Sequence, residues 1–123
     1  MIEYAVTVYL NGDKFWRLEG KLHREDGPAV EYANGKKSWY REGKLHRKDG
    51  PAVEYDDGNK IWYLNGKVHR EDGPAVEYAD GDRSWYLNGV NLSEEDFNKA
   101  LEKPKTIVID GVTYKLEKLD DRL

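Results

Sequence analysis

The chain has 123 residues, enough for one domain, and 36% of them are charged while 38% are hydrophobic. A net charge of −4 argues against a dedicated nucleic-acid binder, and the absence of cysteine excludes disulfides and thiolate chemistry. The first residues lack the features of a signal peptide, and no stretch approaches the roughly 18 apolar residues of a membrane span. We therefore expect a soluble, cytoplasmic protein that contacts no membrane.

A repeat organises most of the chain. Its tryptophans follow one another at intervals of 23 residues, at positions 16, 39, 62 and 85. Three full units begin at the first three tryptophans and are identical at thirteen positions, and residues 5–15 form a partial unit before them. Periods of about 20–50 residues are typical of proteins in which each unit packs on its neighbours. The sequence predicts a mainly β fold, an elongated antiparallel sheet of repeated β-hairpins over residues 1–89.

Each unit contains one predicted hairpin. In the first full unit, Asn34-Gly35 offers the two residues of positive φ that a type I′ turn requires. A two-residue turn would pair Val30 with Trp39, and would place both side chains on one face of the sheet together with Tyr32. Tyr40 would then lie on the opposite face.

A loop of the form HRxDGP links each hairpin to the next. His46 and Asp49 could form a base and its orienter, but no nucleophile accompanies them in every unit. Successive units lie about 10 Å apart, too far for neighbouring histidines to share one ion. We expect no catalytic residue, no metal site and no cofactor. A residue that recurs in every unit is best explained by contact with the next unit, although a repetitive ligand remains the alternative.

The sequence changes character over residues 90–123. Ser93 begins a pattern that resembles a capping box, an amphipathic helix follows it, and Pro104 should end that helix. Residues 106–116 then predict a second kind of hairpin, which turns at Asp110-Gly111. Because repeat sheets need closed ends, we interpret residues 90–123 as a helix and hairpin cap. A helix that binds a partner is the alternative.

The repeated elements resemble MORN-type repeats. The GKxH motif and the aromatic strand before it match that family, in the HRxDGPA variant of small bacterial and phage proteins. The resemblance covers about residues 5–101, and residues 86–101 are similar to the ending of many small phage proteins. It implies a protein that scaffolds other proteins, touches membranes, or serves as an immunity or antitoxin partner. The acidic balance of this chain speaks against the membrane role.

The leading hypothesis is a phage-encoded binding protein that docks on a protein of the bacterial host, or on a toxin, and inhibits it, for example as an anti-defence protein in the host cytoplasm. Function is best sought where the units differ and where aromatic or arginine side chains are exposed, since these residue types dominate interaction hot spots. The candidate partner-binding residues are Arg17, Tyr40, Arg41, Tyr63 and Tyr86. An ordinary cross-strand aromatic ladder is the alternative interpretation of the three tyrosines.

Three other hypotheses remain open. Repeated cations of the linking loops could hold the phosphates of a nucleotide messenger, so that the protein sequesters a ligand. The candidate ligand-binding residues are Lys44, His46, Arg47, Lys67, His69 and Arg70. An immunity or antitoxin role follows from the resemblance alone, and a structural spacer is the fourth possibility. Because one face of a single sheet needs cover, we also expect a homodimer.

Overall fold

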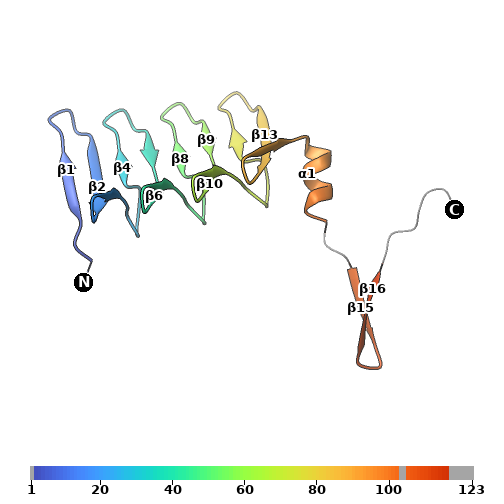
Figure 1. Ribbon diagram of the computed structural model, residues 1–123. Coiled ribbons are helices and arrows are strands. Elements are labelled where there is room, and N and C mark those ends of the chain that lie inside the picture. Colours follow the sequence, from blue (N-terminus) through green and yellow to red (C-terminus); the bar gives the residue numbers. More distant parts are fainter. Residues whose placement is uncertain (1, 103–104, 117–123) are drawn as a thin grey trace.

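The structure of the protein is a computed structural model that describes residues 2–102 and 105–116. It confirms a mainly β architecture, in which hairpins stand side by side in a row and a helix follows them (Figure 1). The first unit contains β1 (Ala5–Val8), β2 (Lys14–Leu18) and β3 (Lys21–Leu22). The next unit contains β4 (Val30–Glu31), β5 (Lys37–Ser38), β6 (Tyr40–Arg41) and β7 (Lys44–Leu45). The last units contain β8 (Val53–Glu54), β9 (Lys60–Ile61), β10 (Tyr63–Leu64), β11 (Lys67–Val68), β12 (Val76–Glu77), β13 (Arg83–Leu87) and β14 (Val90–Leu92).

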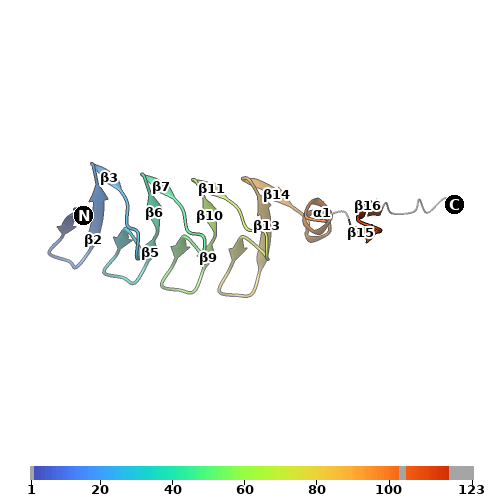
Figure 2. The same ribbon diagram turned by 90° about the horizontal axis from the view of Figure 1, so that it is seen from below.

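Ten of these strands form one antiparallel sheet in the order β1-β2-β4-β5-β8-β9-β12-β13-β14, with β3 paired to β2. Neighbouring units join where the second strand of one hairpin pairs with the first strand of the next, for example where Ser38 lies opposite Val53. In each of the two middle units, a separate two-stranded hairpin follows in the sequence, β6–β7 after β5 and β10–β11 after β9. Figure 2 shows β3, β7, β11 and β14 along one side of the row.

The turn at Asn34-Gly35 is one residue longer than the sequence suggested. Gly35 has a φ of 99°, whereas Asn34 is not in the left-handed region, so the type I′ prediction was wrong. The Gly35 N–H donates to the Tyr32 carbonyl (3.0 Å), and the Tyr32 N–H donates to the Lys36 carbonyl (2.9 Å). This is the three-residue loop in which a type I turn precedes a left-handed glycine.

The longer turn moves the tryptophan to the other face of the sheet. Val30 lies opposite Ser38 and not opposite Trp39. A shift of one residue carries every side chain of a strand to the opposite face. Val30 and Tyr32 therefore share a face with Ser38, while Trp39 lies on the reverse side.

Type I′ turns do occur, at the tips of the second hairpins. Both central residues there have positive φ, about 50° for the first residue and about 81° for the glycine. These turns are Glu19-Gly20, Glu42-Gly43, Asn65-Gly66 and Asn88-Gly89. The tips are thus sharp, and the last three lie beside the preceding unit, as where the Gly66 N–H donates to the Leu45 carbonyl (2.8 Å).

The core is a thin line of small residues along the row. Ala29, Ala52 and Ala75 have no exposed surface, and the valine that follows each of them is also buried. The backbone of a neighbouring strand passes close by, since the Trp39 N–H donates to the Ala52 carbonyl (2.7 Å). A larger side chain than alanine would push these strands apart, so the repeat keeps this residue in every unit.

The predicted helix and hairpin at the carboxyl end are both present. Helix α1 (Glu94–Ala100) begins at Ser93, whose side chain accepts the Asp96 N–H (3.1 Å), and its Phe97 is only 3% exposed. The helix contacts β13 and β14 at the end of the sheet. The predicted stop, Pro104, lies outside the described residues. No described helix is long and apolar enough to cross a membrane.

The carboxy-terminal hairpin consists of β15 (Lys105–Ile109) and β16 (Val112–Leu116) and turns at Asp110-Gly111, as predicted. Figure 1 shows it beyond α1, away from the row of repeats. Its apolar side chains are exposed, namely those of Ile107, Val108, Ile109, Val112 and Tyr114.

Candidate functional site

The arginine of each HRxDGP loop is held on four sides by its own unit. The Arg47 guanidinium lies over the Trp39 ring, 3.9 Å from its centroid, and Nε donates to Asp49 (3.0 Å). Nη1 donates to the Pro51 carbonyl (3.1 Å) and to Glu54 (3.4 Å). The same contacts recur around Arg24 and Arg70. The arginine therefore ties the loop to the Trp face of the sheet.

The arginine also explains why the loop has an aspartate and a glycine at its next conserved positions within the repeat, Asp49 and Gly50 in the second loop. The hydrogen bond and the charge of Arg47 lower the pKa of Asp49, and Arg70 lowers the pKa of Asp72 chiefly by its hydrogen bond. A Cβ added at Gly50 would lie 2.9 Å from the Arg47 Cζ, which is closer than such contacts allow. The side chains of Arg47 and Asp49 thus act inside the loop. The contact with the next unit that we expected of the arginine is made by its backbone instead, since the Arg47 N–H donates to the Tyr63 carbonyl (3.1 Å).

The histidine of each loop does reach the next unit. Nδ1 of His46 accepts the Asn65 N–H (2.9 Å), at the tip of the following type I′ turn. His23 and His69 accept the equivalent N–H groups of Glu42 and Asn88, again at 2.9 Å. Burial and the charges of Arg41 and Lys48 lower the pKa of His46. Through Nδ1, the histidine of each loop therefore accepts a backbone hydrogen bond that joins successive units.

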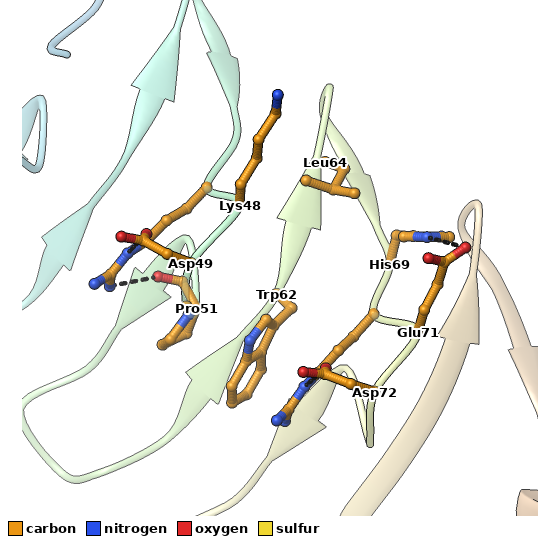
Figure 3. Close-up of a pocket in the computed structure, with 11 residues that line it drawn as sticks. Lys48, Asp49, Pro51, Trp62, Leu64, His69, Glu71 and Asp72 are labelled. Atoms are coloured by element: carbon orange, nitrogen blue, oxygen red, sulfur yellow. Dashed lines mark hydrogen bonds and ion pairs between the residues drawn. The ribbon is translucent and has the colours of Figure 1, made fainter.

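A groove separates each pair of successive loops. The groove between the second and third loops has a volume of about 600 Å³, and the one before it is of the same size. In Figure 3, Trp62 lies between the two loops, with Lys48 and Asp49 on one side and Glu71 and Asp72 on the other. Each groove therefore combines an aromatic wall with charges of both signs.

The six predicted ligand-binding residues do not form one site. Arg47 and Arg70 are held by the contacts described above, and His46 and His69 use Nδ1 within the sheet. Lys44 and Lys67 are exposed on β7 and β11, and in the part of the chain that the structure describes neither pairs with a carboxylate. In residues 2–102 and 105–116, no group of three or more acidic or histidine side chains is arranged to hold a metal ion.

The three predicted tyrosines form a continuous row. Tyr40, Tyr63 and Tyr86 are half-buried and occupy the same position in successive units. Burial raises the pKa of Tyr40, and the neighbouring Tyr32 and Tyr63 raise it further. The pKa of Tyr63 is raised by burial first and then by Tyr55 and Tyr86. The row thus also meets a second row of tyrosines, which we had grouped with the tryptophans.

We call both rows together the tyrosine face, which consists of Tyr32, Tyr40, Tyr55, Tyr63, Tyr78 and Tyr86. The sequence pointed to the first row by its repeat position, but the wrong hairpin register hid the second. A cation also lies on this face: Lys36 Nζ is 4.7 Å from the centroid of the Tyr55 ring and 5.4 Å from that of Tyr32. It bridges two units.

The two predicted arginines lie in different places. Arg17 takes the position of Tyr40 in the first unit, where its guanidinium lies 5.6 Å from the Phe15 ring centroid and its Nη1 donates to Thr7 (3.3 Å). Arg41 instead lines the groove beside the first two loops and pairs with Glu25 (2.7 Å). Only Arg17 therefore continues the tyrosine face.

The chain was compared with protein-family models, with curated proteins and with solved structures, and none of the three comparisons finds a match.

Proposed function

We propose that the chain is a non-enzymatic binding protein of MORN-type repeats, phage-encoded and acting in the host cytoplasm, which docks on a host or partner protein and inhibits it. The observation that carries this proposal is the tyrosine face. Tyrosine is among the residue types that dominate protein–protein hot spots, because a large ring is buried while its hydroxyl finds a partner. Six such rings on one side of a repeat sheet make a surface suited to a protein partner.

The arrangement of the rings supports docking. Tyr40, Tyr63 and Tyr86 are half-buried, so that their rings are held in place before any partner arrives. Side chains that are already ordered lose little conformational entropy on binding. Tyr55 and Tyr78 are exposed and supply the apolar area that a partner would cover. Lys36 adds one positive charge between the rings, which favours a partner that presents a carboxylate there.

The HRxDGP loops are less suited to bind a protein partner. Their arginines already contact a tryptophan, two carboxylates and a carbonyl, and their histidines accept a backbone hydrogen bond from the next unit. A partner that took hold of these groups would have to break contacts that fix each loop to its own unit or join it to the next one.

The proposal is tested by co-purification from bacterial lysate followed by mass spectrometry. We compare wild type with the variant that combines Tyr40→Ala, Tyr63→Ala and Tyr86→Ala. The matched control carries alanine on the reverse face, at the exposed residues Lys37, Lys60 and Arg83. Unfolding midpoints of both variants are measured first, so that loss of structure is recognised.

The expected result is one protein retained by wild type and by the control, but not by the tyrosine variant. The purified partner should then bind wild type directly, and wild type should reduce its activity. If wild type retains no specific protein, or if the folded tyrosine variant retains the same protein as wild type, the proposal is wrong.

A second candidate function is sequestering a nucleotide-type ligand, which the two equal grooves between the loops favour. Each groove offers a tryptophan ring on which a base could stack and has the cation Lys48 at its wall, and Arg41 adds a second cation to the groove between the first two loops. Calorimetry against a panel of nucleotides tests this candidate, with Trp39→Leu and Trp62→Leu as variants. The candidate requires heat with wild type and a weaker signal with the variants; no heat from any nucleotide removes it.

A further inference from the structure

The sheet is closed differently at its two ends. At the carboxyl end, α1 contacts β13 and β14 and buries Phe97. At the amino end, in the described part of the chain, β1 pairs with β2 alone and its other edge is open. An open edge invites another strand, and natural proteins usually block it with lysine, proline or a bulge. The four residues of β1, Ala-Val-Thr-Val, contain no such block.

The backbone groups that face the open edge can be identified. The Tyr9 N–H donates to the carbonyl of Asp13, just before β2, and the Tyr9 carbonyl accepts the Gly12 N–H, so both groups of Tyr9 point toward the β2 side. In an antiparallel ladder, the residues of hydrogen-bonded pairs alternate along the strand. Ala5 and Thr7 therefore also turn their N–H and C=O groups toward β2, and Val6 and Val8 turn theirs away from it.

The side chains of the same two valines are exposed. Val6 is 47% exposed and Val8 is 62% exposed, and Leu10 beyond them is fully exposed. Val6 and Val8 share one face of β1, because side chains of a strand alternate. Free hydrogen-bonding groups and uncovered apolar side chains thus belong to the same two residues.

We propose that this edge pairs with β1 of a second copy of the chain, antiparallel and around a two-fold axis at Thr7. In that register Val6 of one copy lies opposite Val8 of the other, and each pair exchanges two hydrogen bonds. The same pairing sets the exposed valines side by side on one face. The strand is therefore complementary to its own copy: Val6 and Val8, the two residues whose backbone groups face the open edge, both belong to hydrogen-bonded pairs with the other copy in this register.

The two-fold arrangement has a consequence for assembly and for binding. Each copy has one β1, so the pairing uses up the open edge and ends at a dimer. A two-fold axis perpendicular to the sheet keeps each face on its own side, so the tyrosine faces of the two copies would lie on the same side of one longer sheet. The pairing does not depend on the proposed function, since it follows from the edge alone.

A first experiment measures the mass of wild type by sedimentation equilibrium up to about 1 mM protein, a range that reveals even weak association. The matched variant is Val8→Pro, which removes an N–H that faces the open edge and leaves the ladder with β2 intact. Val8→Lys is a second variant that blocks the edge by charge. We expect a reversible monomer–dimer equilibrium for wild type and monomers for both variants, with unchanged circular dichroism.

A second experiment tests the register. The chain has no cysteine, so Thr7→Cys introduces a single thiol at the proposed axis. In the proposed register, residue 7 of one copy lies opposite residue 7 of the other in a non-hydrogen-bonded pair, and such residues lie close enough for a disulfide. With oxidised glutathione as the oxidant, Thr7→Cys should form a covalent dimer faster than Ala33→Cys, which places the thiol on an exposed turn of another unit. Wild type that stays monomeric or grows beyond dimers, a folded Val8→Pro variant that still dimerises, or equal rates for the two cysteine variants would overturn the proposal.

Discussion

Arg47 is the residue whose removal tests the role of the loops most severely. Its side chain is 22% exposed and it contacts a ring, a carbonyl and two carboxylates of one unit. Arg47→Ala removes all of these contacts and leaves the loop held by its backbone hydrogen bonds and by His46. We expect the variant to fold with a markedly lower free energy of unfolding.

The magnitude follows from the buried contacts. The cation–π contact with Trp39 at 3.9 Å contributes about 1–2 kcal/mol at a largely covered site. The buried Pro51 carbonyl loses its charged donor, which costs about 1–2 kcal/mol. The ion pair with Glu54 adds about 0.5 kcal/mol after allowance for solvent screening. The expected loss is therefore about 2.5–4.5 kcal/mol.

The assay is urea unfolding followed by tryptophan fluorescence. With a slope of about 2 kcal/mol per molar urea, the midpoint of Arg47→Ala should fall by about 1–2 M. Arg47→Lys keeps the charge but lacks the planar fork, so it should lose more than half as much. Lys48→Ala on the same loop is the control and should stay within about 0.5 kcal/mol of wild type. If Arg47→Lys were as stable as wild type, or if Arg47→Ala behaved like Lys48→Ala, the reasoning would be refuted.

Three further changes test other parts of the structure. The pKa of His46 in the folded protein lies below its usual 6.5, so the stabilisation from the neutral ring is complete above that pH and is lost as the pH falls through the lowered pKa. The urea midpoint should therefore drop less on acidification in His46→Gln than in wild type. Equal drops in the two proteins would contradict this. Glu42 has a φ of 51°, which asparagine tolerates better, so Glu42→Asn should raise the unfolding free energy by about 0.5–1 kcal/mol; a lower midpoint would show that the turn is not strained. Phe97→Ala should cost about 3–5 kcal/mol locally and increase hydrogen exchange in β13 and β14, whereas unchanged exchange would mean that α1 does not close the sheet.

The sequence predicted the architecture because the repeat is local. Regular tryptophan spacing and an identical linking loop require each unit to meet the next in the same way, so a row of hairpins was the simplest solution. The carboxy-terminal helix and hairpin were also predicted correctly, since Ser93 and Asp110-Gly111 are strong local signals.

The register could not be predicted from the same evidence. An Asn-Gly pair suits both a two-residue turn and the longer turn that the structure contains. A contact between units favours the longer one: the extra loop residue, Ala33, donates its N–H to the Asp13 side chain of the preceding hairpin (2.7 Å). Asn59 accepts the Ala79 N–H in the same way. The turn propensity of a short sequence gives no information about these side chains of the preceding hairpin, which accept the hydrogen bond.

The candidate site was predicted only in part, because one row of tyrosines is independent of the hairpin register and the other depends on it. Tyr40, Tyr63 and Tyr86 were found from their repeat position, which does not depend on the register. Their neighbours Tyr32 and Tyr55 were assigned to the tryptophan face, because the predicted turn was one residue too short. The grooves between the loops depend on the spacing of folded units, which no single loop sequence reveals.

The central claim is that the repeated loops hold the array together and leave the tyrosine face free to bind. Long-range nitrogen NMR spectra of the three imidazole rings test it most directly, because the tautomer reports which ring nitrogen accepts a hydrogen bond. If His23, His46 and His69 each join two units, all three neutral rings should carry the proton on Nε2, with Nδ1 accepting. Rings protonated on Nδ1, or averaged between the two tautomers, would contradict the account.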